Sequence, residues 1–246
     1  MSPETLLARK DLSVVISTKD AKNEILQILH DGDYPQELIY DGPAIYFIDN
    51  RGREEQYFGP EFMTYGKNEV FVDAGCLNFG SSLDLMKHCQ HAKIYAFEPS
   101  SENYQLCLKR QKRNPILADA KLFPYGTWSE KRTLFFKENG GSSHICIGDD
   151  GDRSISVISI DEVIDPGDHV TMIKMDVEGS ELESLKGAAQ TIRQDKPKLA
   201  ICIYHKPEDL WEIPLYIKDL VPEYRLYIRH HSNMATETVL YAVMPE

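Results

Sequence analysis

The chain has 246 residues, of which 42% are hydrophobic and 27% charged, so it is long enough for one α/β domain with a full core and a small extension. Its 39 acidic and 27 basic residues give a net charge of −12, which would repel nucleic acid and an anionic membrane surface unless a local basic patch intervened. The basic cluster at residues 109–113 ends a predicted helix, where cations complement the helix dipole, so we expect neither partner. Five cysteines without a Cys-x-x-Cys pair, and no apolar stretch of signal-peptide or membrane-spanning length, lead us to expect a cytoplasmic protein with reduced thiols.

Residues 1–65 form a predicted N-terminal extension, because their pattern differs from the regular alternation that follows. Within them, residues 21–30 predict a short amphipathic helix that an Asp-Gly-Asp segment ends. Residues 40–43 predict a turn, and residues 44–48 predict a short strand. We expect this extension to act as a lid, a substrate contact or a dimer surface for the main domain, which covers residues 66–246.

From Glu69 onward, apolar runs alternate with helical patterns. The runs that predict strands covered on both faces are residues 70–73, 94–97, 122–125, 170–175 and 199–204. Helices are predicted between the first of these strands, at residues 82–89 and 101–113. This alternation predicts right-handed crossover connections and a mainly parallel sheet.

The alternation changes between Thr133 and Ile160. Residues 133–136 and 155–158 predict two antiparallel strands around the glycine-bearing loop at residues 139–144. Loops of this type often close over ligands, but most are simply turns. The sequence therefore leaves the role of this insertion open.

The most regular helical pattern covers residues 181–193. Ser180 and Glu183 have the spacing of a capping box, in which each side chain satisfies a free backbone donor at the helix start. The apolar residues then recur at spacings of three or four: Leu182, Leu185, Ala189 and Ile192. We therefore expect one continuous helix over this range.

The C-terminal region predicts one further helix and two strands. Residues 208–220 are helical in pattern, with Trp211 expected in the core and a kink expected at Pro214. Residues 225–228 and 238–243 are apolar runs whose connection is too short for a crossover helix, so they should pair antiparallel. The predicted fold class is therefore α/β, with a mainly parallel sheet finished by an antiparallel pair.

Two strand ends carry acids that suit a nucleoside. Asp73 ends the first strand before a turn that begins at Gly75, and Glu98 ends the second strand. An acid at the second position can accept hydrogen bonds from both hydroxyls of a ribose, while the glycine turn lets the ligand approach the backbone. The alternative is that Glu98 only caps the helix that begins at residues 99–101. The glycine turn upstream favours adenosine recognition.

The glycine turn also distinguishes between ligands. Its sequence from Gly75 to Gly80 is Gly-Cys-Leu-Asn-Phe-Gly, which lacks the middle glycine of Gly-x-Gly-x-x-Gly. The close approach of a pyrophosphate needs that glycine. A ligand without a pyrophosphate therefore fits better, and a nicotinamide-dependent oxidoreductase on a Rossmann-like sheet is the disfavoured alternative.

Three segments, taken in order and spacing, carry a resemblance to a known family. They are Val72-Asp73-Ala74-Gly75, Phe97-Glu98-Pro99, and Ile173-Lys174-Met175-Asp176-Val177-Glu178-Gly179-Ser180-Glu181-Leu182 with Leu185-Lys186-Gly187-Ala188. With these motifs the chain resembles, over residues 69–204, the FkbM family of S-adenosylmethionine-dependent methyltransferases. The resemblance implies a class I methyltransferase fold, which is a Rossmann-like, mainly parallel seven-stranded sheet with an antiparallel terminal strand and helices on both faces.

The same resemblance implies an activity and a set of cofactor-binding residues. The activity is O-methyl transfer from S-adenosylmethionine to a hydroxyl of a saccharide or small secondary metabolite, with S-adenosylhomocysteine as the product. The residues implied for the cofactor are Asp73, Gly75, Asn78, Gly80, Ser81, Glu98 and Asp176, with Asp73 near the amino acid end and Glu98 on the ribose. The family's first turn usually reads Gly-Ala-Asn-x-Gly; here it is one residue longer, which moves the asparagine to Asn78.

Candidate catalytic residues lie at the ends of the fourth and fifth strands. Methyl transfer requires the acceptor to be aligned with the donor, and a neutral hydroxyl benefits from a base within hydrogen-bond reach. Asp176, Glu178 and His205 are the candidates, with Asp176 or His205 as the base. Three roles are open to His205: base or substrate contact, partner of a carboxylate, or metal ligand with Asp176. Lys174, inside an apolar strand, is suited to pairing with an acid.

The acceptor cannot be identified from the sequence. The residues suggested for it are Ser142, Ser143, His144, His205 and His230. A divalent metal and a homodimer are compatible with the sequence, which supports neither, and a catalytically silent cofactor-binding module is a further alternative to the enzyme.

Overall fold

The computed structural model describes residues 7–8, 10–11, 14–16, 22–41, 56–137, 144–146, 153–232 and 236–245. The chain divides into two compact units. The smaller is Met1–Glu54 with Ser232–Ala235, and the larger is Glu55–His231 with Thr236–Glu246.

The smaller unit combines one helix with a pair of short strands. Helix α2 (Lys22–Asp31) confirms the helix predicted near its N-terminus, and β1 (Val14–Ile16) pairs parallel with β2 (Ile39–Asp41). The predicted turn at residues 40–43 is therefore wrong in its first half, because that half is the end of β2. The predicted strand at residues 44–48 lies outside the described residues.

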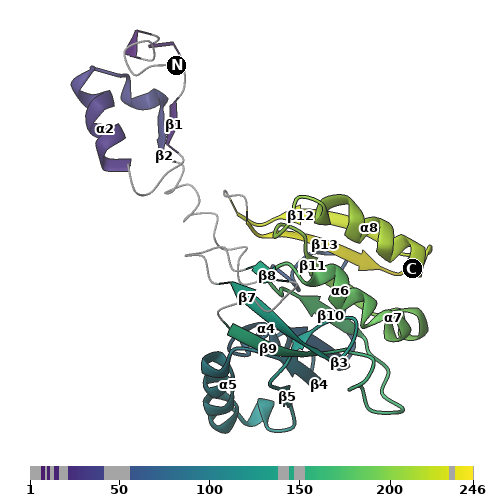
Figure 1. Cartoon of the computed structure of the whole chain (residues 1–246). Coiled ribbons are helices and arrows are strands. Elements are labelled where there is room, and N and C mark those ends of the chain that lie inside the picture. Colours follow the sequence, from purple (N-terminus) through teal and green to yellow (C-terminus); the bar gives the residue numbers. More distant parts are fainter. Residues whose placement is uncertain are drawn as a thin grey trace. The chain divides into compact units, whose positions relative to one another are not determined.

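The larger unit is built on a seven-stranded sheet in the order β12-β13-β11-β10-β3-β4-β5 (Figure 1). In chain order its strands are β3 (Asn68–Ala74), β4 (His91–Phe97), β5 (Lys121–Phe123), β10 (Met172–Met175), β11 (Lys198–Cys202), β12 (Arg225–His230) and β13 (Thr238–Val243). Strand β13 is antiparallel to both neighbours, and the other pairs are parallel. The predicted mainly parallel sheet with an antiparallel C-terminal pair is confirmed.

The apolar strands are explained by helices on both faces of this sheet. Neighbouring residues of β3 enter different cores: Phe71 belongs to one buried cluster and Val72 to the other. The first cluster includes residues of α4 (Gly80–Leu85) and α5 (Ser101–Arg113); the second includes residues of α6 (Glu181–Lys186), α7 (Ala189–Asp195) and α8 (Asp209–Leu220). Because successive side chains of a strand point to opposite faces, a continuous apolar run supplies both layers.

The insertion between β5 and β10 forms a second sheet of four strands, in the order β6-β9-β7-β8. Strands β7 (Arg132–Lys137) and β9 (Arg153–Ile158) pair antiparallel, as predicted, while β6 (Gly126–Thr127) and β8 (His144–Cys146) flank them. Most of the predicted glycine-bearing loop lies outside the described residues.

The predicted continuous helix over residues 181–193 is wrong, because α6 and α7 are separate helices. The carbonyl oxygen of Gly187 accepts hydrogen bonds from the Ser159 hydroxyl at 2.7 Å and from the backbone N–H of Asp161 at 2.9 Å. The Asp161 carboxylate in turn accepts from the backbone N–H of Gln190 and of Thr191. A distant segment therefore ends one helix and starts the next.

The predicted capping box is also absent. The Ser180 hydroxyl donates to the carbonyl of Val177, whereas the carboxylate of Glu183 accepts from Ser129 and Lys186. Trp211, expected in the core, is 55% exposed, because the buried side of α8 is formed mainly by other residues. None of the described helices is both long and apolar enough to cross a membrane.

Candidate functional site

The site lies where the carboxyl ends of the central parallel strands meet. The register pairs Ala74 of β3 with Phe97 of β4 and with Met175 of β10. The residues that follow these strands therefore emerge at one edge of the sheet. In open α/β sheets this edge is where ligands bind.

The turn after β3 is held close to the segment after β10. Gly75 has a φ of +74°, and a Cβ at this position would lie 1.9 Å from the carbonyl oxygen of Asp176. The backbone N–H groups of Gly75 and Cys76 both donate to the carbonyl of Phe97. Only glycine fits both this backbone conformation and this close approach.

The longer turn is stabilised from α5. Arg110 donates through Nη1 to both the carbonyl oxygen and the side-chain oxygen of Asn78, each at 2.9 Å. Leu77 and Phe79 have positive φ angles of 51° and 63°, and Gly80 follows as the first residue of α4. The sequence prediction for Asn78 and Gly80 stays a prediction; the structure gives Asn78 a role in shaping the turn.

Glu98 joins this turn to the start of α5. Its carboxylate, 5% exposed, accepts from the backbone N–H of Leu77 at 3.0 Å and of Ser100 at 2.9 Å. Burial raises the pKa of Glu98, and the two backbone donors lower it only in part. Ser100 is the N-cap of α5, with its hydroxyl accepting from the N–H of Asn103. The structure thus shows the contact of Glu98 with the start of α5, and the ribose-binding role of Glu98 stays a prediction.

Asp73 is the second-last residue of β3, two positions before Gly75, and is fully buried. One carboxylate oxygen accepts from the hydroxyls of Ser81 at 2.7 Å and Ser82 at 2.6 Å, and the other lies 3.4 Å from Nζ of Lys174. Lys174 also donates to the carbonyl oxygen of Gly75 at 2.7 Å. Asp73 and Ser81 thus fix the shape of the turn, and the expected pairing of Lys174 with an acid is confirmed.

The pKa of Lys174 reflects this environment. Burial alone lowers it, but the charges of Asp73 and Asp176 more than compensate, so that the pKa of Lys174 is raised. The ammonium group therefore keeps its charge although the residue is only 3% exposed.

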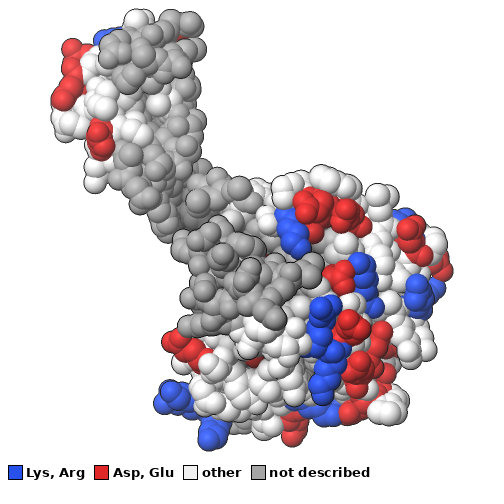
Figure 2. Space-filling model, viewed as in Figure 1, with Lys and Arg blue, Asp and Glu red and all other residues white. Residues whose placement is uncertain are grey.

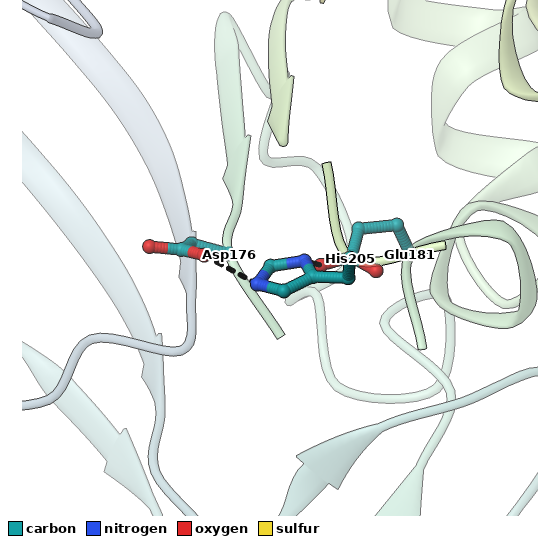
Figure 3. A group of neighbouring side chains, drawn as sticks. All are labelled: Asp176, Glu181 and His205. Carbon is teal, nitrogen blue, oxygen red and sulfur yellow. Dashed lines mark ion pairs between the residues drawn. The ribbon is translucent and has the colours of Figure 1, made fainter. Parts of the chain in front are cut away.

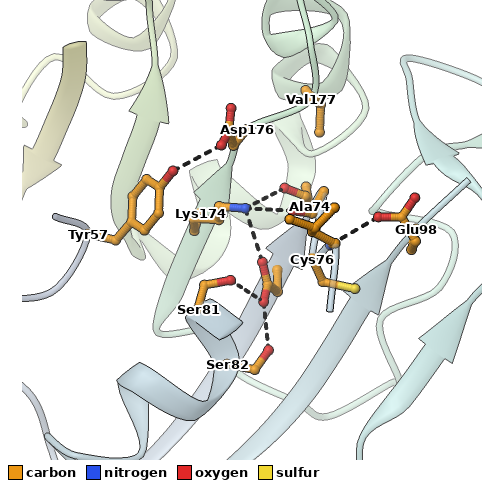
Figure 4. Close-up of polar contacts among 12 residues, drawn as sticks. Tyr57, Ala74, Cys76, Ser81, Ser82, Glu98, Lys174, Asp176 and Val177 are labelled. Carbon is orange, nitrogen blue, oxygen red and sulfur yellow. Dashed lines mark hydrogen bonds and ion pairs between the residues drawn. The ribbon is translucent and has the colours of Figure 1, made fainter. Parts of the chain in front are cut away.

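Asp176 follows β10 and accepts two phenolic hydrogen bonds. Tyr57 donates to one carboxylate oxygen at 3.1 Å (Figure 4). Tyr204 donates to the other at 3.2 Å. Burial is the main cause that raises the pKa of both tyrosines far above its usual value, and the neighbouring Asp176 carboxylate raises it further, so that both hydroxyls stay protonated donors. Neither tyrosine was predicted as a site residue. Tyr57 comes from a segment that carries no motif, and Tyr204 was assigned only to the end of a strand.

His205 lies between carboxylates on both sides of its ring (Figure 3). Its Nε2 atom is 3.6 Å from Asp176 and 3.5 Å from Glu178, and its Nδ1 atom is 2.8 Å from Glu181. Burial lowers the pKa of His205, but Glu181 and then Asp176 and Glu178 outweigh it, so the net shift is upward. The structure thus brings the three predicted catalytic residues together.

Glu181 is a residue of this group that sequence reasoning did not assign to it. It is fully buried at the start of α6 and accepts from the backbone N–H of Val177 at 3.0 Å. The feature of the sequence that could have identified Glu181 is its position in the motif from Ile173 to Leu182, which resembles the FkbM family. Asp176, Glu181 and His205 each offer one possible metal-ligand atom, and these three atoms lie within 4.8 Å of one another.

The structure describes only some of the residues that the sequence suggested as acceptor contacts. His230 is exposed in β12, where its Nδ1 atom lies 2.8 Å from the hydroxyl of Thr238. Ser142 and Ser143 lie outside the described residues, and His144 is described only as part of strand β8. Among the suggested acceptor contacts whose side chains the structure describes, His205 and His230, it is His205 that lies beside Asp176.

Comparisons with known proteins agree with this arrangement. The chain matches the methyltransferase FkbM domain over residues 77–233. It is similar to the crystal structure of methyltransferase FkbM from Methylobacillus flagellatus KT, with 27% identity and a TM-score of 0.66, covering 98% of this chain and 57% of that one. The chain thus spans less than two thirds of the length of that relative, and no curated protein matches it.

More distant structures share the fold alone. A putative rRNA-methylase from Clostridium thermocellum is 10% identical with a TM-score of 0.50, covering 81% of this chain and 97% of that one. A chain of a fibrillarin/Nop5p complex is 11% identical with a TM-score of 0.51, covering 80% of this chain and 83% of that one. With the class I methyltransferase sheet and a domain match over more than half of its length, the chain belongs to the FkbM family of S-adenosylmethionine-dependent methyltransferases.

Proposed function

We propose that this chain transfers the methyl group of S-adenosylmethionine to a hydroxyl oxygen of a saccharide or another small hydroxylated metabolite. The observation that carries the proposal is the contact between the two halves of the site. The carbonyl oxygen of Asp176 lies 1.9 Å from the position that a Cβ of residue 75 would take, and the Asp176 side chain faces His205. A donor bound at the glycine turn would therefore have a carboxylate and an imidazole beside it.

The cofactor half of the site consists of the turn from Gly75 to Gly80 together with Glu98. Glu98 is suited to accept from the ribose hydroxyls, and the turn supplies close backbone approach for the methionine part. Asp73 and Ser81 would act from beneath by holding the turn in shape, as their buried hydrogen bond indicates.

The catalytic half would bind the acceptor hydroxyl and receive its proton. In the transfer, the acceptor oxygen forms a bond to the methyl carbon while the sulfur–methyl bond breaks, and the sulfur keeps the electron pair in S-adenosylhomocysteine. The hydroxyl proton passes to Asp176 or His205, and Glu178 lies 3.5 Å from Nε2 of His205. Alignment of acceptor and donor is the other contribution that such a site makes.

A small acceptor is supported by the charge of the protein. Acidic and basic side chains lie beside one another on the face of the larger unit shown in Figure 2, and the net charge is −12. Lys93, for example, is paired with Asp165 and Asp168. A nucleic acid backbone would favour a surface with unpaired basic residues instead. We propose that the extension of residues 1–65 contributes as a lid, an acceptor contact or a dimer surface.

Cofactor binding is tested by calorimetry of the purified protein with S-adenosylmethionine. We expect saturable binding by the wild type and a loss of affinity of about 10- to 100-fold for Glu98→Ala, because a charged hydrogen-bond acceptor is lost. Glu102→Ala is the matched control, since Glu102 is an exposed acid on the neighbouring helix. Absence of binding by the wild type would exclude the proposal.

Catalysis is tested by a screen of hydroxylated metabolites for release of S-adenosylhomocysteine. Once an acceptor is found, Asp176→Asn and His205→Ala should lower turnover while cofactor binding persists. If neither substitution changed turnover, the catalytic assignment would be wrong. If no hydroxylated compound were methylated although the cofactor bound, a catalytically silent binding module would be the better description.

A further inference from the structure

The group around His205 contains buried polar atoms that the protein itself leaves without hydrogen bonds. Among the described residues, four buried side-chain atoms lack a hydrogen-bond partner, and three of them are Oε2 of Glu181 and both ring nitrogens of His205. The ring is 10% exposed, and the Nδ1 contact with Glu181 is short but not aligned as a hydrogen bond. Buried polar atoms are rarely left without partners, and Nδ1 at least has the Glu181 carboxylate beside it. The Nε2 atom is therefore the one that points to a missing ligand.

The charge of the group indicates a cation. Asp176, Glu178 and Glu181 surround one imidazole, which leaves excess negative charge even when the ring is protonated. The nearest buried lysine, Lys174, is already engaged with Asp73 and with the carbonyl of Gly75. Of the three acids, Glu181 is fully buried and Asp176 is 26% exposed, and carboxylates held away from water need a compensating positive charge.

The spacing on the Nε2 side of the ring suits metal coordination. Asp176 and Glu178 place carboxylate oxygens 3.6 Å and 3.5 Å from Nε2 of His205. Metal–ligand bonds of about 2.0–2.2 Å in tetrahedral or octahedral geometry put neighbouring ligand atoms roughly 3–3.6 Å apart. Asp176 and His205 already belong to the group whose possible ligand atoms lie within 4.8 Å of one another. Glu178, which is 77% exposed, would turn toward an ion at Nε2 to supply the third ligand.

The surroundings supply the supports that metal ligands usually have. The other ring nitrogen of a metal-bound histidine commonly faces a carboxylate, and the Nδ1 atom of His205 lies 2.8 Å from Glu181. Ligating carboxylates are commonly hydrogen-bonded as well, and Asp176 accepts from Tyr57 and Tyr204. Glu181 would thus fix the ring while Asp176, Glu178 and His205 hold the ion.

We propose that His205 Nε2, Asp176 and Glu178 form a site for a divalent first-row transition-metal ion beside the methyl donor. One imidazole with two carboxylates suits Mn²⁺, Fe²⁺ or Zn²⁺ better than Ca²⁺. Such an ion, when bound, polarises an acceptor hydroxyl and so favours its deprotonation. This proposal rests on the proposed methyl transfer and makes His205 a ligand in place of a base.

The test is metal binding itself, measured on the full chain after removal of metals with a chelator. Mn²⁺ is titrated by electron paramagnetic resonance and Zn²⁺ by calorimetry, without cofactor or acceptor. We expect binding of a single ion per chain, abolished by His205→Ala. Glu181→Gln should weaken binding by about 10- to 100-fold, because it loosens the ring rather than removing a ligand.

Two further variants keep the test decisive if the buried substitutions impair folding. Glu178→Gln changes an exposed side chain and should weaken binding without changing the thermal unfolding curve. His169→Ala removes an exposed histidine that lies 2.9 Å from Asp195, and it should bind metal as the wild type does. Non-saturable binding by the wild type, or equal binding by wild type and Glu178→Gln, would overturn the proposal.

Failure of the metal site and failure of the proposed function can be told apart. If the chelated protein binds S-adenosylmethionine and turns over an acceptor without any metal, the metal proposal is wrong and the base role of His205 stands. If metal binds but the cofactor does not, the proposed methyl transfer is wrong.

Discussion

Lys174 and Asp73 face one another across the neighbouring strands β10 and β3, with 3.4 Å between the ammonium nitrogen and a carboxylate oxygen. Both side chains are buried, at 3% and 0% exposure. The pair lies directly under the turn at Gly75, whose carbonyl accepts from Lys174. The shape of the turn is therefore tied to a charge pair in the middle of the sheet.

Removal of one partner of this pair should be strongly destabilising. Lys174→Met leaves the Asp73 carboxylate without its counter-charge, and we expect a loss of about 3–5 kcal/mol in the free energy of unfolding. Urea denaturation monitored by circular dichroism measures this loss. The double variant Lys174→Met/Asp73→Asn should be more stable than Lys174→Met alone, because no unpaired charge remains. Equal stability of the two variants would contradict the pairing.

The glycine at position 75 is required for two separable reasons. Gly75→Ala introduces a methyl group at 1.9 Å from the carbonyl oxygen of Asp176 as well as strain at a φ of +74°. Gly167→Ala is the matched control, since Gly167 has a φ of +94° and a Cβ there would meet no atom within 4 Å. The control should cost about 1–2 kcal/mol in unfolding free energy from backbone strain alone. Gly75→Ala should cost more and also abolish binding of S-adenosylmethionine in calorimetry; similar effects of the two substitutions would argue against the close approach.

Cofactor binding should depend on pH through Glu98. Burial raises the pKa of this carboxyl above its ordinary value. In the proposed cofactor site, the ionised form of Glu98 would be the one that accepts from both ribose hydroxyls. Affinity for S-adenosylmethionine should therefore fall as the pH decreases through the raised pKa. Calorimetry over an acidic pH series should show this fall in the wild type and in Glu102→Gln. The Glu98→Gln variant should bind weakly and lack it, and an unchanged pH profile in that variant would assign the dependence to another group.

Asp161 should stabilise α7 from outside the helix. Its carboxylate accepts from the backbone N–H groups of Gln190 and Thr191, both at 2.9 Å, and from the Thr191 hydroxyl at 2.7 Å. Asp161→Ala should lower the free energy of unfolding by about 1–2 kcal/mol, as loss of a helix N-cap does. Glu162→Ala, which alters the exposed neighbouring acid, should change stability little. A comparable loss in both variants would mean that general charge, rather than capping, is responsible.

Much of the sheet follows from the sequence because its signals are local. The apolar runs that became β3, β4, β10 and β11 are continuous since both faces of these strands are covered, and helix α5 has the predicted bounds. The antiparallel C-terminal pair follows from the short connection between its strands. The acids at the strand ends could be placed at one edge for the same reason, since parallel strands share an edge for their carboxyl ends.

The errors occur where distant segments override a local pattern. The capping spacing of Ser180 and Glu183 was correct as a pattern, yet Glu183 is engaged by Ser129 and Lys186. The helical period continues through Gly187, yet its carbonyl is taken by Ser159 and Asp161. The hydrogen bonds from Ser129, Ser159 and Asp161 join residues far apart in the chain, and no periodicity predicts them.

The sequence by itself determined the fold class, the family and the acids that end the central strands. Strand hydrophobicity, turn residues and a long motif each depend on residues that are close together in the chain. The tertiary structure decided that Asp73 is sealed under the turn, that Tyr57 and Tyr204 hold Asp176, and that Glu181 holds His205. These contacts depend on strand register and on the packing of α6 against the sheet edge. They are therefore fixed by the positions of whole elements, which only the folded chain supplies.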